Sequence, residues 1–403
     1  MTARTLDADP PCPGPIESLP RTIDSIGTAP STALRAVRRP FTDFARGTWD
    51  ALAARNPAAT PFSAWAFQRA WWDAYGGNAH EEVLALIAAD APAGADPVAI
   101  VPLMHRHEVE ESDALTHTTM RHAGGANLTP VPPTAKAIFF GASYHADYAT
   151  VLASPADLPR VAAAVAAYLA GPDCGEWDVV DLRRLRCADP TGETLAAALG
   201  AIEMANDWTL NLEREDVCPV VTFPDGVDMD GYLSTLGKKQ RHEIRRKVRR
   251  AEANGEIRLD DSADPLADLE AFIDLHQRRW GADGLFPPTP GGDQSRVLFQ
   301  RMFELFGTDG PLRLAFLSVG GRRIAAGIHF LSGDKLLYYN AGVDPDAREL
   351  SPGVLMVHAY VARALEDGIR QLDFLRGNES YKYDWGGVDE PIQRLLVRRG
   401  GQP

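Results

Sequence analysis

Residues 336–382 constrain the fold of this chain more than any other segment. The apolar run Leu336–Val343 predicts a β-strand, and Asp344-Pro345 ends it because proline cannot donate to a sheet ladder. A helix is predicted from Gly353 onwards, since the apolar residues of 354–365 recur at helical spacing. The order of strand, turn, helix and second strand predicts an α/β unit in which a helix begins close to the end of a strand.

The turn before this helix has the composition of an anion site. Ser351 suits the N-cap and Pro352 suits the first helical position. Free backbone N–H groups and the positive end of the helix dipole would follow, with an arginine close by, and this geometry suits a pyrophosphate. The sequence therefore predicts a site for a phosphorylated acyl donor or acceptor at Arg348, Ser351, Gly353, Val354 and Leu355. A helix capped by Ser-Pro-Gly for structural reasons alone is the alternative.

Length, composition and charge limit the class of protein. At 403 residues the chain is long enough for two domains, and its 45% hydrophobic and 24% charged residues are typical of a soluble globular protein. The formal charge of -14 disfavours a general binder of nucleic acid or anionic membranes. Neither a secretory segment nor a run of ~18 apolar residues is present, so we expect a cytoplasmic protein without integral membrane association. No CxxC pair or metal-ligand spacing joins the cysteines, which we expect to be reduced: Cys12, Cys174, Cys187 and Cys218.

Two lobes of about equal length are predicted after an N-terminal leader. Residues 1–38 are rich in Pro, Ala, Thr and Ser and are expected to be disordered. Helices alternate with mostly antiparallel strands in residues 39–215 and again in residues 216–398. We interpret this pattern as an α/β (α+β) fold of two tandem lobes, each a sheet flanked by helices. The second lobe should contain a long helix from about Met229 to Asn254 and another helix from Pro265 to Trp280. A loop, Gly281–Gly292, follows and is long enough for a substrate lid.

The long helix carries a run of cations that stands out in an acidic chain. Lysine and arginine fill most of Lys238–Arg250, where only Glu243 opposes them, beside a narrow apolar stripe. This concentration would attract a polyanionic acceptor or the phosphates of a donor, and we take Arg241, Arg245 and Arg249 as candidate substrate-binding residues. The alternative is a solvated face whose arginine stems only cover apolar surface.

Polar residues also follow the strand after the predicted anion site. Asp373 alternates with Leu372 and Phe374, so its side chain faces the opposite side of the strand. A carboxylate that faces a cleft there would act as a base or orient an acceptor amine, whereas a satisfied edge carboxylate is the alternative. Lys382 lies in a glycine-containing loop, where functional residues tend to lie, and a surface lysine paired with Glu379 or Asp384 is its alternative.

Together these motifs resemble a family of acyl-transferring enzymes. A three-strand meander, a strand ending in Gly-x-Asp-Pro, the Ser-Pro-Gly turn and the segment Leu372–Lys382 look like the acyltransferase domain of the CelD-like group of cellulose biosynthesis. That group belongs to the GNAT superfamily and is similar to the Fem-type peptidoglycan aminoacyl transferases. The stretch Leu236–Glu252 resembles the basic helix of the same group. The resemblance covers about residues 218–397 and is weaker at residues 62–72 and 140–148.

The resemblance implies where a donor and the reacting groups would lie. In GNAT enzymes the acyl-CoA pyrophosphate sits between the fourth strand and the following helix, which here is the loop Arg348–Leu355. This loop departs from the usual pattern of two glycines, since Pro352 and Val354 stand beside its single glycine. By resemblance to Fem-type enzymes, Lys382 would bind a phosphate or stabilise the oxyanion of the attacked carbonyl. The predicted catalytic residues are Lys382, Asp373 and Tyr381, and Glu379 joins the arginines of the basic helix as a predicted substrate-binding residue.

No metal site and no covalent intermediate are predicted. The ten histidines form neither HExxH nor another metal-spaced set, and His329, between apolar neighbours on a meander strand, is expected to be a satisfied core residue. Neither a GxSxG nor a Cys-His motif is present to indicate an acyl-enzyme. Direct attack by an acceptor amine needs only positioning, a proton sink and oxyanion donors.

The sequence and the resemblance together predict an acyl-CoA-dependent N-acyltransferase. The acceptor would be a polar amine on a small molecule, a saccharide or a nucleotide-linked compound, bound between the lobes beside the basic helix, and no DNA partner is expected. Fem-type aminoacyl transfer from charged tRNA is an alternative, which the acidic balance and the absence of an inserted coiled-coil arm disfavour. A non-catalytic scaffold in envelope or polysaccharide assembly is a second alternative. The acyl group, the acceptor and the oligomeric state stay open.

Overall fold

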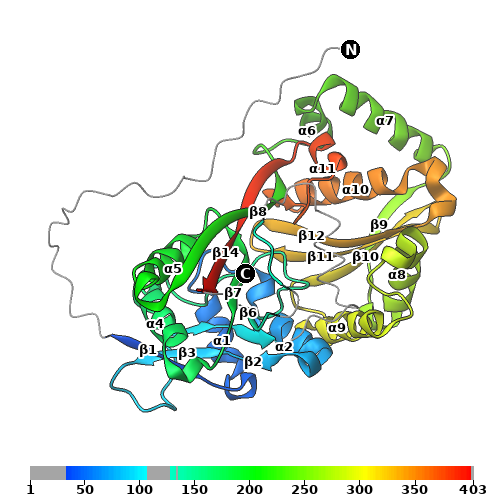
Figure 1. Cartoon of the computed structure of the whole chain (residues 1–403). Helices are drawn as coiled ribbons and strands as arrows, with labels where there is room; N and C mark the ends of the chain where they lie inside the picture. The colour runs from blue at the N-terminus through cyan, green and yellow to red at the C-terminus, as the bar shows by residue number, and fades with distance from the viewer. Residues whose placement is uncertain (1–32, 107–127, 133–134, 401–403) are drawn as a thin grey trace.

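The computed structural model describes residues 33–106, 128–132 and 135–400, whose helices and strands are drawn in Figure 1. The first half of the chain contains β1 (Leu34–Arg38), α1 (Arg46–Ala53), α2 (Trp65–Tyr75), β2 (His80–Glu81), β3 (Leu84–Ala88), β4 (Ala99–Val101), β5 (Leu103–Arg106), β6 (Ala137–Phe140), α4 (Leu158–Ala170), β7 (Val179–Arg186), α5 (Thr191–Gly200) and β8 (Trp208–Thr222). The second half contains α6 (Met229–Thr235), α7 (Lys238–Glu252), β9 (Ile257–Asp261), α8 (Pro265–Trp280), α9 (Pro290–Phe306), β10 (Leu312–Val319), β11 (Arg322–Ser332), β12 (Lys335–Val343), η8 (Pro345–Leu350), α10 (Pro352–Glu366), β13 (Gln371–Asp373), α11 (Ser380–Asp384) and β14 (Val388–Arg399).

One large sheet runs through both halves of the chain. Its eleven strands lie in the order β2-β5-β6-β7-β14-β8-β13-β12-β11-β10-β9, and a second sheet has the order β1-β3-β4. Most neighbouring strands are antiparallel, and the parallel pairs are β6 with β7 and β12 with β13. None of the helices in the described ranges combines the length and the apolar character needed to cross a bilayer.

The two halves repeat one order of elements. In each half, two helices (α1 and α2, or α8 and α9) precede antiparallel strands that lead to β6 or β12. A helix (α4 or α10), a parallel strand (β7 or β13), another helix (α5 or α11) and a last strand (β8 or β14) follow. α2 and α9, which occupy the same place in this order, pack against each other. The fold is therefore α/β (α+β) with two tandem lobes, and α6 and α7 are an addition in the second.

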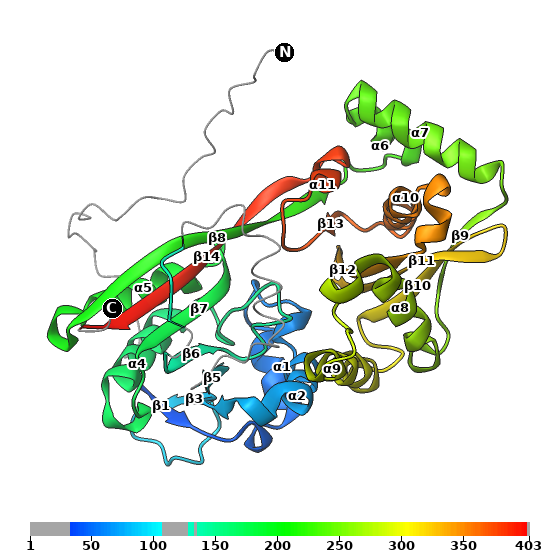
Figure 2. The ribbon, with the colours of Figure 1, turned by 45° about the vertical axis from the view of Figure 1, so that its right-hand side comes forward.

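The last strands of the two lobes change places. β14 of the second lobe pairs antiparallel with β7 of the first, and β8 of the first lobe pairs antiparallel with β13 of the second. β8 and β14 also pair with each other, from Val388↔Val220 to Arg399↔Trp208. Figure 2 shows them as a long ribbon that crosses between the lobes. Each lobe thus completes its sheet with a strand of the other.

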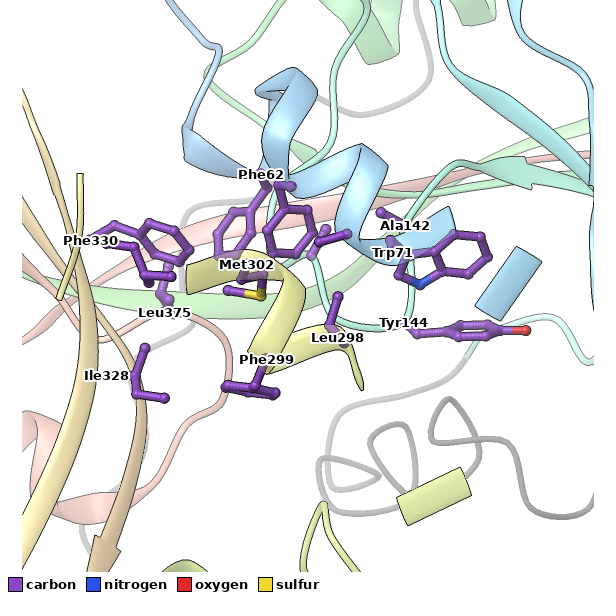
Figure 3. Close-up of a cluster of buried hydrophobic side chains, with 14 of the residues drawn as sticks. Phe62, Trp71, Ala142, Tyr144, Leu298, Phe299, Met302, Ile328, Phe330 and Leu375 are labelled. Atoms are coloured by element: carbon purple, nitrogen blue, oxygen red, sulfur yellow. The ribbon is translucent and has the colours of Figure 1, made fainter. Parts of the chain in front are cut away.

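A shared apolar core also joins the lobes. Phe62 and Trp71 of the first lobe belong to the same buried cluster as Phe299 and Met302 of α9 and Phe330 of β11 (Figure 3). A second cluster lies under α4 and α5, and a third lies under α6, α7 and α10. Since the first cluster takes side chains from both lobes, neither lobe has this core to itself.

Local signals set the ends of α8, as the sequence predicted. The Asp264 carboxylate accepts a hydrogen bond from the Ala267 N–H at 3.1 Å, which caps the helix before its first residue, Pro265. Gly281, at φ 56°, follows the last residue and adopts a left-handed conformation that L side chains rarely take.

Three expectations about local structure were wrong. The predicted leader ends too late, because Leu34–Arg38 forms β1 and pairs with β3; residues 1–32 lie outside the described residues. The helix predicted from Met229 to Asn254 is two helices, since Leu236 is extended between α6 and α7. The loop predicted as a lid is shorter, because α9 begins at Pro290. Phe286 also anchors that loop, being 2% exposed within the core shared by the lobes.

The strand exchange predicts that the second lobe does not fold alone. A chain of residues 216–398 keeps β14 but lacks β7 and the first part of β8, so most of β14 loses its partners. We expect broad, non-cooperative thermal unfolding of this fragment by circular dichroism, whereas the full chain should unfold cooperatively. A monomeric fragment with a sharp transition would contradict the exchange and support the predicted boundary at residue 216.

Candidate functional site

β12 and β13 diverge in the middle of the second lobe. Their parallel pairing covers three residues of each strand and ends at Leu337↔Asp373. β12 continues to Val343, and the register of its pairing with β11 shifts opposite Ile328 and His329, which is the mark of a β-bulge. Beyond Leu337, β12 therefore has no strand partner on the β13 side among the described residues. α10 begins just after this stretch, following η8.

The first turn of α10 presents one open amide. Ser351 occupies the N-cap place at a left-handed φ of 59°, and its side chain does not cap the helix. The N–H groups of Val354 and Leu355 donate to the Ser351 carbonyl at 3.0 and 3.2 Å, so the prediction that these two amides are free was wrong. The Gly353 N–H has no backbone acceptor in the described part of the chain. A Cβ built on Gly353 would meet no atom within 4 Å, so the space over it is open.

Two arginines lie at this helix start. Arg250 of α7 donates from Nη2 to the Ser351 Oγ at 2.8 Å, and its Nε is buried without a partner among the described residues. Arg348 is exposed on η8. The first turn of α10 contains no acidic residue, so the positive helix end is not neutralised from within. Open space, a free amide and positive charge together suit an anionic group.

The three arginines predicted to bind substrate lie elsewhere on α7. Arg241 and Arg250 are separated by about two and a half helical turns, so they point to opposite sides of the helix. Arg241 donates to a carbonyl of α6, Arg245 pairs with Asp230 of α6 at 2.8 Å, and the Arg249 Nε donates to the Arg245 carbonyl. Figures 1 and 2 show α6 and α7 at one edge of the molecule. The structure thus brings Arg250 to the start of α10, and not the three arginines that were predicted to bind substrate.

Lys382 is buried and closes the loop that follows β13. Its Nζ donates to the carbonyls of Leu375, Arg376 and Gly377 at 3.0, 2.9 and 2.9 Å, and pairs with Glu379 at 2.8 Å. An ammonium group has three hydrogens, so these partners engage all of them. This arrangement corrects the prediction that Lys382 faces a phosphate or an oxyanion. Glu379, predicted to bind substrate, lies in the same clamp.

Asp373 is buried where β13 ends, and it faces the first lobe. Its Oδ2 accepts a hydrogen bond from the Tyr148 hydroxyl and its Oδ1 accepts one from the Leu375 N–H, both at 2.8 Å. Burial raises the pKa of Asp373 to about 6, although both hydrogen bonds favour the charged form. A carboxyl group with this pKa exchanges protons close to neutral pH, as a general base must.

Tyr381 lies on the other face of β13. Its ring packs edge-on against Phe374 with centroids 5.8 Å apart, and Phe374 also contacts Tyr338. Phe374 and Tyr338 belong to the apolar cluster under α10, whereas Tyr148 belongs to the cluster between the lobes. Packing against these rings raises the pKa of the Tyr381 phenol, although the residue is 38% exposed. The structure therefore places Tyr381 and Asp373 on opposite sides of the strand.

Two other residues of this region have structural roles. The Asp344 carboxylate accepts a backbone N–H of η8 at 3.0 Å and pairs with Arg278 and Arg322. His329 is buried beside the Tyr360 hydroxyl at 3.0 Å, and burial lowers its pKa to about 3. In the described ranges, no group of three or more His, Cys, Asp or Glu side chains is placed to hold a metal ion.

Sequence reasoning missed two contacts at this site. Arg250 was part of the cationic run, but its partner Ser351 lies 101 residues further along the chain. Tyr148 belongs to the other lobe and is 225 residues from Asp373. The cationic run was a signal for the first contact. The weaker family resemblance at residues 140–148 covered Tyr148 but did not indicate its partner.

The region from α7 to α11 matches a known family. Residues 238–383 fit the model of an acetyltransferase (GNAT) domain. The second lobe contains a GNAT acetyltransferase domain, and the protein is a transferase. Among curated proteins, none matches the sequence.

Solved structures resemble this transferase over most of its length. FemX superposes with a TM-score of 0.54 at 10% sequence identity, over 89% of this chain and 96% of FemX. A conserved protein of unknown function from Bacteroides thetaiotaomicron gives a TM-score of 0.50 at 11% identity, over 89% of this chain and 98% of that protein. A tandem GNAT protein from the clavulanic acid biosynthesis pathway gives 0.47 at 12% identity, over 92% and 99%. The first two likenesses concern the fold and extend over both lobes.

Lys382 of the GNAT domain is expected to matter for stability. Lys382→Met keeps much of the stem but leaves three loop carbonyls without their donor in a buried place. Since an unsatisfied buried polar group costs about 1 to 3 kcal/mol, we expect the free energy of unfolding in urea to fall by about 3 kcal/mol. Lys238→Met, at an exposed position of α7, is the control and should change it by less than about 0.5 kcal/mol. If Lys382→Met were as stable as the unmodified protein but had a much lower turnover, the ammonium group would have a catalytic role.

Asp373 predicts a pH dependence of stability in the acid range. Its folded pKa of about 6 lies above the ordinary value of 3.8, so the folded protein binds more protons than the unfolded chain between these values. Stability should therefore fall as the pH rises from about 4 to about 6, by about 3 kcal/mol at about 1.4 kcal/mol per pKa unit. Asp373→Asn cannot ionise and should lack this fall. Urea unfolding of both proteins across this range provides the measurement, and equal slopes would show that Asp373 titrates normally.

Proposed function

We propose that the protein transfers an acyl group from acyl-CoA to the amine of a polar acceptor. The observation that carries this proposal is the start of α10, where the Gly353 N–H has no backbone acceptor among the described residues, the space around a Cβ at Gly353 is open, and Arg250 and Arg348 lie nearby. A pyrophosphate requires amide donors and positive charge of this kind. The unpaired backbone of β12 beyond Leu337 offers hydrogen bonds to the amide groups of the pantetheine arm.

The matching place in the first lobe is less suited to the donor. α4 has Asp157 at its N-cap, and this carboxylate pairs with Arg160 in the first turn. A negative charge there repels a pyrophosphate, whereas α10 has the neutral Ser351 in the same place. This difference supports a donor site in the second lobe.

Direct attack of the amine on the thioester accounts for the reaction without a covalent enzyme intermediate. The new C–N bond forms as the carbonyl becomes an oxyanion, and collapse of this intermediate breaks the C–S bond and releases the CoA thiolate. The attacking amine loses a proton and the thiolate gains one. The reaction therefore needs a base on the acceptor side and an acid on the donor side.

We assign these two roles to Asp373 and Tyr381, which both lie close to the end of β13. Asp373, with a pKa of about 6, is ionised at neutral pH and takes the proton of the amine. The Tyr148 hydroxyl, which donates to Asp373, is placed to pass that proton inwards. Tyr381, whose raised pKa keeps it protonated, supplies the proton to the thiolate. Lys382 is a positioning residue that holds the loop after Asp373.

Aminoacyl transfer from charged tRNA is the second candidate. Lys238, Lys239 and Arg249 are exposed on α7, and none of them forms an ion pair within the described ranges. A helix edge of this kind attracts a nucleic-acid backbone. The same cations, with Arg241 and Arg245, suit an acceptor that carries phosphate or carboxylate groups, which is the acceptor class of the first proposal.

Substitution at Gly353 tests the donor site. No atom lies within 4 Å of a Cβ at this position, so both Gly353→Ala and Gly353→Asp should fold, but only aspartate adds negative charge to the helix start. By isothermal titration calorimetry we expect CoA affinity to fall at least about tenfold in Gly353→Asp and to stay within about twofold in Gly353→Ala. Equal affinities in all three proteins would move the donor site elsewhere.

Titration of the full chain with CoA, acetyl-CoA and charged tRNAs separates the candidates. Binding of CoA and acetyl-CoA without tRNA supports the proposal. Binding of charged tRNA alone would replace it by aminoacyl transfer. Binding of none of them, with no acyl transfer to a broad panel of amines, would leave a scaffold role and overturn both enzymatic candidates.

A further inference from the structure

A pocket of 210 Å³ lies apart from the candidate donor site. It is lined by the turn after α1, by the segment that leads into α4, by the segment after β7 and by Lys335 at the start of β12. None of its lining residues belongs to α7, η8 or α10. Its volume is below the ~300 to 1,000 Å³ of sites for drug-sized ligands, so it suits a compact ligand or group.

This pocket is the counterpart, in the first lobe, of the place where the second lobe is proposed to bind its donor. Leu158, the first residue of α4, and Arg186, the last residue of β7, both line it. In the repeated order of elements, α4 and β7 correspond to α10 and β13. Because Asp157 occupies the N-cap position of α4, its carboxylate opposes an anion at this helix end, and recognition must depend on side chains.

Two of the polar residues in the lining are already satisfied. The Asp189 carboxylate accepts hydrogen bonds from the Thr150 hydroxyl at 2.6 Å and from the Thr191 N–H and hydroxyl at 3.0 and 2.9 Å. The Asn56 amide donates to Thr150 Oγ1 and to the Val151 carbonyl at 3.0 and 2.8 Å. Their hydrogen bonds hold the wall of the pocket, and neither is arranged to receive a cationic ligand.

Two cations in the lining retain free donors. Lys335 forms no ion pair with any residue that the structure describes. Arg186 pairs with Glu390 through Nη2 at 2.8 Å, but its Nε is buried and has no partner among the described residues. A buried N–H without a partner is costly, and an anion between these two cations would supply the missing acceptor.

We propose that this pocket binds a compact anion, a phosphate or dicarboxylate group, between Arg186 and Lys335. Arg186 offers its Nε–H and Lys335 its ammonium, and the apolar walls at Pro57, Ala58 and Ala153 limit the size of the ligand. Arg186 belongs to the first lobe and Lys335 to the second, so the anion connects the lobes.

The proposed anion would also bind close to Asp373, the proposed base. The Arg186 guanidinium lies over the Tyr148 ring, with its Cζ 5.0 Å from the centroid, and the Tyr148 hydroxyl donates to Asp373. An occupied pocket fixes the guanidinium that covers Tyr148. The site is therefore linked through two residues to the end of β13, although its binding does not depend on the acyl-transfer proposal.

Calorimetric titration of the full chain with orthophosphate and, separately, with malonate tests this site, at an ionic strength held constant with sodium chloride. We expect saturable binding and a melting temperature that rises with the concentration of the anion. Lys335→Met removes one charge, and Ala58→Leu fills the pocket while keeping both charges. Each should weaken binding about tenfold or more. Arg258→Met, which removes an exposed cation of β9 outside the pocket, should leave the affinity unchanged.

The outcomes separate this proposal from the donor site. Binding of orthophosphate alone assigns the pocket to a phosphate group, and binding of malonate alone assigns it to a dicarboxylate. The proposal would be overturned if neither anion showed saturable binding. It would also be overturned if Lys335→Met and Ala58→Leu both bound the anion as tightly as the unmodified protein. Gly353→Asp should keep the anion site while losing CoA, and Lys335→Met should keep CoA while losing the anion. The two sites can therefore fail independently.

Discussion

A buried ion pair between Arg394 and Asp181 aligns the exchanged strand β14 with β7 of the first lobe. Arg394 on β14 donates to both oxygens of Asp181 on β7, at 2.6 and 2.9 Å, and both side chains are almost fully buried. A bidentate pair of this kind accepts only one relative position of its two strands. Alignment matters here because β14 changes register near Gln393 in its pairing with both β7 and β8. Because the desolvation of two charges offsets much of their attraction, we interpret the pair as a device for register more than for stability.

The exchange also fixes the end of β13, where the proposed chemistry takes place. β13 is only three residues long, and it lies between β8 of the first lobe and β12 of the second. The loop after it is held from both lobes: Arg376 pairs with Asp147 at 3.2 Å, while Lys382 binds the loop carbonyls. The position of such a short strand is set by its pairing with these neighbours. The position of Asp373 therefore depends on how the lobes join.

Sequence patterns predicted the features that depend on residues close together in the chain. α8 runs from Pro265 to Trp280 as predicted, because its cap and its terminating glycine act on adjacent backbone, and the meander follows from its tight turns. The predicted start of α10 agrees with the structure for the same reason. Strand exchange was not predicted, since the partners of β8 and β14 are set by contacts between distant segments. The role of Lys382 was missed because a lysine in a polar loop has the same local sequence whether its ammonium meets water or three carbonyls.

The first lobe contributes to the proposed reaction by excluding water from one face of β13. Side chains alternate along this strand, so Phe374 faces α10 while Asp373 faces the first lobe. Tyr148 covers the Asp373 carboxyl, and the burial that results raises its pKa to about 6. In an isolated second lobe this carboxyl would face water and return towards its ordinary pKa of 3.8, which would make it a weaker base. The lobe that lacks a suitable donor helix thus sets the basicity of the proposed base, and the exchanged strands fix the position of that residue.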